Sequence, residues 1–496
     1  MTAAEIIVGA TAVPCHPWPR HALTAEEWRA LGETSGLELL ALWADPTQVY
    51  ALFHDAEAGR FLPASVAVVE GGYAALSPQR PAAAWFERMV HDLWGHTAVG
   101  GTDARPWLNH GRWGLAAPLA ARPGALAVTP APPEFLPVAA EEFHQIALGP
   151  VFGGIGEPAH FRLSAEGEAV LRLEARLGYA HKGTLGLLRG KSPRAAARFA
   201  ARISGDAAVA HGVAFARAAE AAAATDAPPR ANALRGVMAE LERIANHFSD
   251  VAAVAEAAGF AVLAAPAMRL REAVLNGADA AFGHRLMMDC VIPGGVAADL
   301  DAGGVAAIEG ALALVDAGFF DIVRLIDGSS SFSDRLAVGV VEPALVARCA
   351  SGGPVGRAAG RAFDVRKTPG YPPYGSLVFE VPTSVAGDAE ARLRVRLAEI
   401  RESLRLLRSL LGTLPGGPVS LPLPLASGEG IGWAEGCRGD IWHWLRLDGG
   451  LISAAFVRDP AWLQFFLLEA AMAGGVVADF PLCLASFGCS VSGMDL

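Results

Sequence analysis

The sequence lacks closely spaced cysteines. Its six cysteines are scattered, and no two of them stand at the Cys-x-x-Cys spacing typical of zinc and iron–sulfur sites: Cys15, Cys290, Cys349, Cys437, Cys483 and Cys489. The same scatter gives no disulfide framework of the kind found in small secreted proteins. We therefore expect neither a zinc or iron–sulfur site nor a fold that depends on disulfides.

The chain is also short of positive charge. Its formal net charge is −11, from 40 Lys and Arg against 51 Asp and Glu. Because no basic stripe is present to release counterions, general nucleic-acid binding is excluded. The opening residues, MTAAEIIVGATAVPCHPWPRH, lack the basic segment with which a signal peptide starts.

Uncharged hydrophobic runs of membrane-spanning length are missing as well. The most apolar stretches lie near 251–266, 304–325 and 462–487, and each contains acidic residues. A carboxylate at the centre of a bilayer is costly. We therefore expect a cytoplasmic chain without a transmembrane segment of its own. With 52% hydrophobic residues over 496 positions, the chain has room for more than one buried core.

What is present indicates an α+β protein in two parts. The segment 115–140 is rich in Ala and Pro, nearly uncharged and without a helix or strand period, which is typical of a linker. Before it, hydrophobic patterns predict three strands and one helix, at 36–45, 48–55, 64–71 and 81–95. After it, two strands around a turn are followed by long helices, at 160–183, 229–259, 269–289 and 388–412.

We accordingly predict a small α+β domain over 1–114 and a linker over 115–144. A mainly α-helical domain with a helix-bundle core is predicted over 145–496, because several amphipathic helices bury their apolar faces most simply against one another.

Two segments resemble nucleotide-binding motifs, but each lacks a glycine that its motif requires. GLLRGKS (186–192) resembles a phosphate loop, but Leu185 stands where the first glycine should be. GGIG (153–156) lacks the later glycine of the dinucleotide fingerprint and indicates a turn. His91 and His96 stand five apart, the wrong spacing for one helix face.

Seven longer segments, in a fixed order, resemble known proteins. They read PAAAWFERMVHDLWG (81–95), GPVFGGIGEPAHFRL (149–163), YAHKG (179–183), PRANALRGVMAELERIANHF (229–248), IPGGVAADL (292–300), LPGGP (414–418) and EGCRGDIWHW (435–444). The first resembles the closing helix of the small α+β subunit shared by respiratory complex I and the energy-converting hydrogenases. The others resemble the nickel–iron hydrogenase large subunit of the formate hydrogenlyase and hydrogenase-4 type. The resemblance covers about residue 60 to the end and links the chain to complexes that bind NAD and quinone.

In the hydrogenases, two Cys-x-x-Cys motifs supply four thiolates to nickel and iron. The matching segments here place Ser204 and Ala207, then Cys489 and Ser492, at the four ligand positions. A serine hydroxyl stays protonated at neutral pH and binds a soft metal poorly, and alanine offers no donor. We therefore expect no nickel–iron site and no hydrogen chemistry in this chain.

The related complex I subunit grips quinone with a histidine and a tyrosine. The matching positions here are Phe152 and Gly205, so the resemblance does not imply that this chain reduces quinone.

The frame around the former metal site persists. Glu157 and His160 match the first-loop acid and histidine that help to carry protons in the family. Arg438 matches the arginine that leans over the metal, with His443 following it. Arg202 and His211 flank the former ligand loop, and Asp206 adds an acid inside it. These residues are candidates for proton relay or ligand binding in a dry cavity.

A structural interpretation competes with this one. Buried charges must pair, so the same groups could simply satisfy one another. Four residues separate Arg202 from Asp206, which is the spacing of a local ion pair.

Three functions follow from the resemblance. The chain could be a hydrogenase-like component of a membrane-associated oxidoreductase complex, held on the cytoplasmic face by an iron–sulfur small subunit and by membrane-arm subunits. The iron–sulfur cluster would then belong to that partner, and this chain would bind no cofactor. Alternatively, it could be a non-catalytic scaffold of the same complex, or a free-standing enzyme using Glu157, His160 and Arg438.

Overall fold

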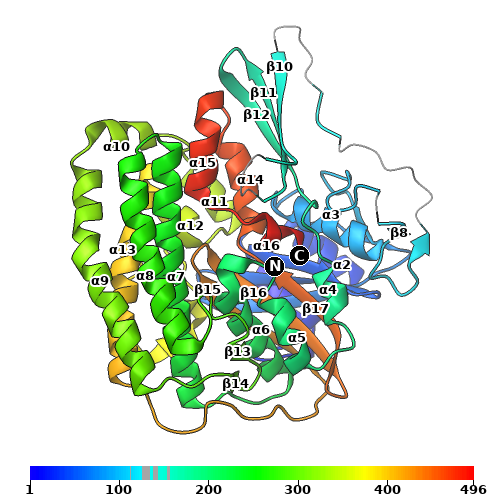
Figure 1. Cartoon of the computed structure of the whole chain (residues 1–496). Helices are drawn as coiled ribbons and strands as arrows, with labels where there is room; N and C mark the ends of the chain where they lie inside the picture. The colour runs from blue at the N-terminus through cyan, green and yellow to red at the C-terminus, as the bar shows by residue number, and fades with distance from the viewer. Residues whose placement is uncertain (112, 126–133, 138–142, 153–156) are drawn as a thin grey trace.

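A five-stranded sheet forms the N-terminal part of the protein (blue in Figure 1). The structure is a computed structural model that describes residues 1–111, 113–125, 134–137, 143–152 and 157–496. The strand order is β1-β2-β5-β4-β3, from β1 (Thr11–Val13), β2 (Arg20–Leu23), β3 (Glu38–Ala44), β4 (Gln48–Asp55) and β5 (Arg60–Ala67). Within this sheet only the β2–β5 pair is parallel. The predicted strands are confirmed, although β5 begins earlier than expected.

Three helices accompany this sheet: α1 (Ala3–Gly9), α2 (Ala25–Glu33) and α3 (Ala83–Trp94). The predicted helix over 81–95 is α3, which contacts β3 and ends at Gly95 in the left-handed conformation. The parallel pair β6 (Gly72–Ala74) and β7 (Thr97–Val99) brackets α3.

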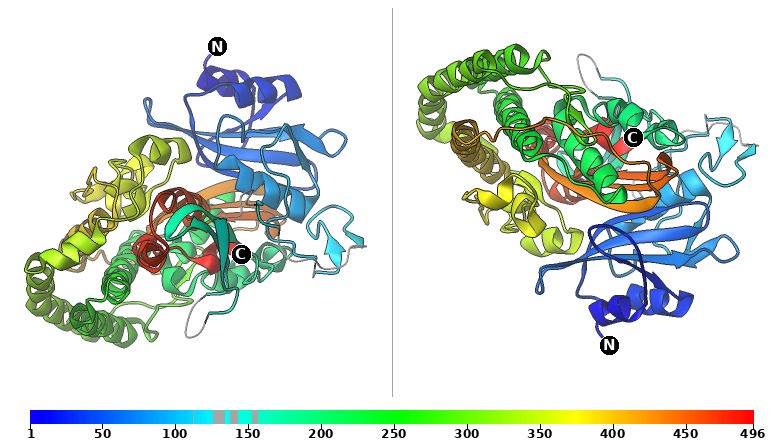
Figure 2. Two further views of the ribbon diagram at one scale, coloured as in Figure 1. Left: turned by 90° about the horizontal axis from the view of Figure 1, so that it is seen from above. Right: turned by 90° about the horizontal axis from the view of Figure 1, so that it is seen from below.

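A second sheet packs against the first. β15 (Gly428–Gly436), β16 (Gly439–Asp448) and β17 (Leu451–Arg458) form an antiparallel meander, shown in orange beside the blue sheet in Figure 2. Trp43 of β3 lies 5.7 Å from Trp444 of β16, and Arg20 forms an ion pair with Glu429 at 2.9 Å. Buried side chains from both sides of residue 114, the predicted end of the first domain, therefore belong to one hydrophobic core. The domain boundaries stay a prediction.

The β15–β17 sheet was not expected, because the sequence after residue 183 indicated mostly helix. Its first strand reads GEGIGWAEG, in which glycines replace the apolar side chains of an alternating strand. The face carrying Gly430 and Gly432 lies directly under α6 (Ala208–Ala222), where a Cβ on either glycine would overlap the helix backbone. The alanine-rich helix and the glycine-rich strand approach each other closely for this reason.

A small antiparallel sheet extends from the molecule (Figure 1). It consists of β10 (Phe143–Leu148), β11 (His160–Glu166) and β12 (Ala169–Arg176), and the predicted turn at Glu166-Gly167 is confirmed. Two short helices, α4 (Thr184–Leu188) and α5 (Pro193–Ala200), lead from β12 toward α6. α4 begins before the segment that resembles a phosphate loop and ends inside it.

The predicted helix bundle is confirmed. Its long helices are α7 (Pro229–Ala257), α8 (Ala261–Phe282), α9 (Ala302–Asp327) and α13 (Ala389–Gly412), which stand side by side in Figure 1. The short hairpin β13 (Val291–Ile292) and β14 (Gly295–Val296) contains the Gly-Gly loop. Between α9 and α13 lie α10 (Ser330–Leu336), α11 (Pro343–Cys349) and α12 (Gly353–Ala358), followed by the helical turns Arg366–Gly370 and Tyr374–Ser376.

The C-terminal segment turns back into the middle of the molecule (red in Figures 1 and 2). It comprises α14 (Ala461–Ala471), α15 (Phe480–Phe487) and α16 (Val491–Asp495), with a helical turn at Val477–Asp479. Leu496 is fully buried. The expected burial is confirmed for most apolar residues of this segment, whereas Val476 is exposed.

The described part of the linker carries some structure. β8 (Leu115–Ala116) pairs with β9 (Gly124–Ala125), and β10 begins inside the predicted range. The turn expected at 153–156 lies outside the described residues. Over the described residues, none of the helices combines the length and apolar character that crossing a membrane requires.

Candidate functional site

Three distant segments meet beside the C-terminal helix. The former ligand loop, Arg202–Ala207, lies at the start of α6, and Arg438 lies in the turn between β15 and β16. The tail at Gly488–Ser492 closes the third side. The hairpin turn is fixed by a close backbone approach, because a Cβ on Gly353 would overlap the Arg438 carbonyl. The fold thus aims Arg438 at the former ligand loop.

An ion pair occupies the centre of this meeting point. The Arg438 guanidinium donates to both carboxylate oxygens of Asp206, Nη1 to Oδ2 at 2.6 Å and Nη2 to Oδ1 at 2.7 Å. The arginine side chain is buried, whereas half of the aspartate side chain is exposed. Burial raises the pKa of Asp206, but the charge of Arg438 and its hydrogen bonds lower that pKa by more. Asp206 therefore stays ionised at neutral pH.

Two serine hydroxyls complete the cluster. Ser204 Oγ donates to Asp206 Oδ1 at 2.5 Å, accepts from Arg438 Nη2 at 2.9 Å and lies 2.9 Å from Ser490 Oγ. These four residues, Ser204, Asp206, Arg438 and Ser490, are called the Arg438 cluster below.

The Arg438 cluster does not fit a nickel–iron centre. Ser204 Oγ already makes three hydrogen bonds, and a guanidinium points at it, so no free donor remains there for a cation. Ala207 has no donor atom. Burial raises the pKa of the Cys489 thiol, which disfavours the thiolate that nickel needs. These side chains therefore do not fit the nickel–iron centre of the hydrogenases that the chain resembles.

A chain of three buried groups lies beside the cluster. His211 Nε2 is 3.1 Å from Asp459 Oδ2, and His211 Nδ1 is 3.1 Å from His443 Nε2. A neutral His211 that donates to the Asp459 carboxylate accepts from His443, whereas a protonated His211 donates to both. Burial, followed by the charge of His211, lowers the pKa of His443 well below its ordinary value. His443 is therefore neutral at neutral pH.

Glu242 is a carboxyl group of this region with a strongly raised pKa. It is buried on α7 and accepts the backbone N–H groups of Val209 at 2.6 Å and Ala210 at 3.0 Å, at the start of α6. Burial raises its pKa to about 8, against those hydrogen bonds. Glu242 is thus neutral at pH 7 while Asp206 is charged.

Polar contacts clamp the terminal helix α16. Glu157 accepts from the N–H groups of Val491 at 2.5 Å and Ser492 at 3.1 Å. Lys182 Nζ donates to the carbonyls of Ile203 at 3.0 Å and Ser492 at 3.2 Å, so that one ammonium joins both former ligand loops.

Asp495 fixes the other end of α16. It accepts from the N–H groups of Gly178 and Ala180, each at 2.7 Å, and burial raises its pKa to about 7.

Two predicted site residues lie away from the Arg438 cluster. Arg202 does not pair with Asp206: it donates to Asp289 at 2.5 and 2.7 Å on the surface, with both side chains about half exposed. The local ion pair expected from their spacing is therefore wrong, because the chain turns between them and Asp206 faces Arg438. His160 begins β11, where its ring lies 4.8 Å from that of Phe135.

Lys182, Glu242, Asp459 and Asp495 were missed as site residues. Asp459 is followed by proline and Lys182 by glycine, which are loop signals without chemical meaning on their own. Glu242 lies in a segment singled out for its resemblance, but only the fold places it against the start of α6.

Comparisons with known proteins agree with this architecture. Residues 258–426 match the family described as the respiratory-chain NADH dehydrogenase 49 kDa subunit. The carbon monoxide-induced hydrogenase of Rhodospirillum rubrum is 30% identical over 354 residues, which cover 70% of this chain and 98% of that protein. Formate hydrogenlyase subunit 5 of Escherichia coli (strain K12) is 27% identical over 427 residues, covering 84% of this chain and 75% of that protein.

The fold also matches a solved structure. A chain of the membrane-bound sulfane sulfur reductase, an archaeal respiratory membrane complex, superposes with a TM-score of 0.68 at 23% identity, covering 72% of this chain and 99% of that one. The protein belongs to the family that unites hydrogenase large subunits of this kind with the 49 kDa subunit of respiratory-chain NADH dehydrogenase.

Proposed function

We propose that the chain is a hydrogenase-like component of a membrane-associated, complex I-related oxidoreductase complex and contributes proton movement without a nickel–iron site of its own. Family membership supports the assignment to such a complex. The observation that supports the loss of hydrogen chemistry is the Arg438 cluster, in which the Ser204 hydroxyl stands at a former thiolate position and already accepts from the Arg438 guanidinium.

In this proposal, electrons pass through an iron–sulfur cluster held by a partner subunit, and membrane-arm subunits keep the chain at the cytoplasmic face of the membrane. Quinone reduction is not part of the proposed activity, because Phe152 and Gly205 offer no hydrogen-bonding side chain at the two quinone positions.

The residues of the site can hold and release protons. Glu242, with a pKa of about 8, and Asp495, with a pKa of about 7, change charge near physiological pH. Asp206 and Arg438 keep fixed opposite charges beside them. A change of charge in a partner subunit beside this region would shift the pKa values of Glu242 and Asp495, since Coulomb interactions are strong away from water.

A scaffold function is the second candidate. It is favoured by the mutual pairing of the Arg438 cluster, in which each charged group has a partner of opposite charge. In that case the Arg438 cluster only holds the former ligand loop, Arg202–Ala207, against the tail at Gly488–Ser492.

The two candidates differ in the intact complex. Arg438→Gln and Glu157→Gln variants should keep the complex assembled but lower its rate of electron transfer if the site works, and leave that rate unchanged if the chain is a scaffold. Arg324→Gln is the control, because Arg324 is exposed and pairs only with Asp321 at the surface. The rate is measured in purified complex with a reduced viologen as donor, and assembly by native gel electrophoresis.

Metal analysis tests the central premise separately. Elemental analysis of the purified full-length chain should find no stoichiometric nickel. One nickel per chain, lost on replacing Cys489 by serine, would overturn the proposed loss of the metal site.

A further inference from the structure

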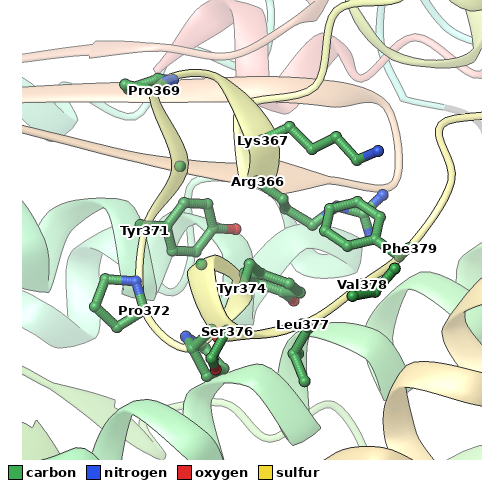
Figure 3. Close-up of a pocket in the computed structure, with 13 residues that line it drawn as sticks. Arg366, Lys367, Pro369, Tyr371, Pro372, Tyr374, Ser376, Leu377, Val378 and Phe379 are labelled. Carbon is green, nitrogen blue, oxygen red and sulfur yellow. The ribbon is translucent and has the colours of Figure 1, made fainter.

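A pocket lies at the edge of the helix bundle, far along the chain from the Arg438 cluster. The segment between α12 and α13 curls around it, and Figure 3 shows the side chains that line it. Its volume is about 820 Å³. The lining comes entirely from one stretch: Arg366, Lys367, Pro369, Gly370, Tyr371, Pro372, Pro373, Tyr374, Gly375, Ser376, Leu377, Val378 and Phe379.

The polar side chains at the floor of the pocket already have hydrogen-bond partners within the protein. Tyr374 donates its hydroxyl proton to Glu240 at 2.6 Å, and the Tyr371 hydroxyl accepts the backbone N–H of Glu435 at 3.1 Å. Arg366 lies between carboxylates, donating to Asp364 at 2.6 Å and to Glu240 at 3.0 Å. Tyr374 and Arg366 are thus already committed to carboxylates.

Lys367 differs from its neighbours. Within the described part of the chain, no carboxylate lies within ion-pair distance of its ammonium group. Its Nζ lies 5.0 Å from the centre of the Phe379 ring, and the side chain is exposed at the pocket.

The rest of the rim is apolar. Phe379 is buried, with Arg366 and Lys367 over its ring, so the exposed apolar surface of the rim comes from Val378 and the half-buried Leu377. Val378 is 86% exposed, which leaves its side chain almost wholly in water. An apolar group covering it would gain burial without displacing a protein contact.

The pocket is held in shape from behind. Asp364 accepts the N–H of Arg366 at 2.8 Å, and Trp433 of β15 donates its indole N–H to the carbonyl of Gly370 at 3.2 Å. A ligand therefore meets a loop whose backbone is already fixed, which lowers the entropic cost of binding.

We propose that this pocket binds a small amphipathic monoanion, whose carboxylate pairs with Lys367 and whose apolar body covers Leu377 and Val378. One cation without a carboxylate partner calls for a ligand with a negative charge, since Arg366 is already paired with Asp364 and Glu240. The volume is within the range of small-molecule sites. This inference does not depend on the proposed function.

The test uses the full-length chain and two probes with the same ring, 2-naphthoate and neutral 2-naphthylmethanol. Ligand-observed NMR titration should show naphthoate binding the more tightly. Lys367→Gln should weaken naphthoate at least about threefold, the loss expected for one partly exposed ion pair, and leave naphthylmethanol unchanged. Lys191→Gln is the matched control, because Lys191 also lies over a phenylalanine ring but lines a different part of the molecule.

A second variant reports on the apolar rim. Val378→Ser should weaken both probes, since it removes exposed apolar surface without touching Lys367. The proposal is overturned if naphthoate does not bind, or if its affinity is the same in Lys367→Gln and in Lys191→Gln.

Discussion

Replacing Glu242 by glutamine should flatten the pH dependence of stability. In the folded chain the pKa of Glu242 is about 8, against 4.5 for an ordinary glutamate, because burial disfavours its charged form. Between those two values the folded state holds a proton that the unfolded state has released. Stability therefore falls as pH rises, by about 1.4 kcal/mol for each pH unit from this one group.

The size of the effect follows from the same two values. Between about pH 5.5 and about pH 8, wild type should lose up to about 3.5 kcal/mol through Glu242. The glutamine side chain cannot ionise, so the variant should not suffer this loss. Its amide nitrogen faces one of the two backbone N–H groups that Glu242 accepts, which costs about 1–3 kcal/mol at every pH. Glu242→Gln should thus be less stable than wild type in acid and match or exceed it above about pH 8.

Urea denaturation followed by tryptophan fluorescence measures this at several pH values. Other buried acids contribute to the slope of both proteins, so the difference between wild type and variant isolates Glu242. Glu309→Gln, at an exposed position of α9, is the control and should follow wild type throughout. A Glu242→Gln variant that keeps the full wild-type slope would refute the argument that this carboxyl is neutral in the fold.

Two further predictions concern packing. Gly430→Ala should destabilise the chain by about 3 kcal/mol or more, because its Cβ would overlap the backbone of α6, whereas Gly416→Ala meets nothing within 4 Å and should change the melting temperature little. Phe135→Ala should speed carbethoxylation of His160 several-fold at neutral pH, because it removes the ring packed on that imidazole. Peptide mass spectrometry measures the rate, with exposed His91 as the internal reference; an unchanged ratio would show that Phe135 does not cover His160.

Much of the architecture could be read from local patterns. Apolar residues at helical spacing predicted the helices over 229–257 and 389–412, and α3 shows the same signal near the N-terminus, although the structure buries charged residues of these helices as well. The turn at Glu166-Gly167 was evident because glycine follows a strand pattern. These features depend on residues close together in the chain.

The candidate site was only partly predictable. Asp206 and Arg438 were both identified, but their ion pair joins residues 232 positions apart and required the β15–β16 turn to be placed over the former ligand loop. The spacing of Arg202 and Asp206 suggested a different pair, which the structure contradicts. Sequence spacing reports a contact only where the backbone between two residues is regular.

By itself, the sequence determined the absence of four metal-binding thiolates and the presence of a helix bundle, since donor chemistry and hydrophobic period belong to residues and their near neighbours. Only the tertiary structure decided what fills the former metal position, which acids are neutral and which charges are unpaired. Burial and partnership set those properties, and both arise from segments that meet only when the whole chain folds.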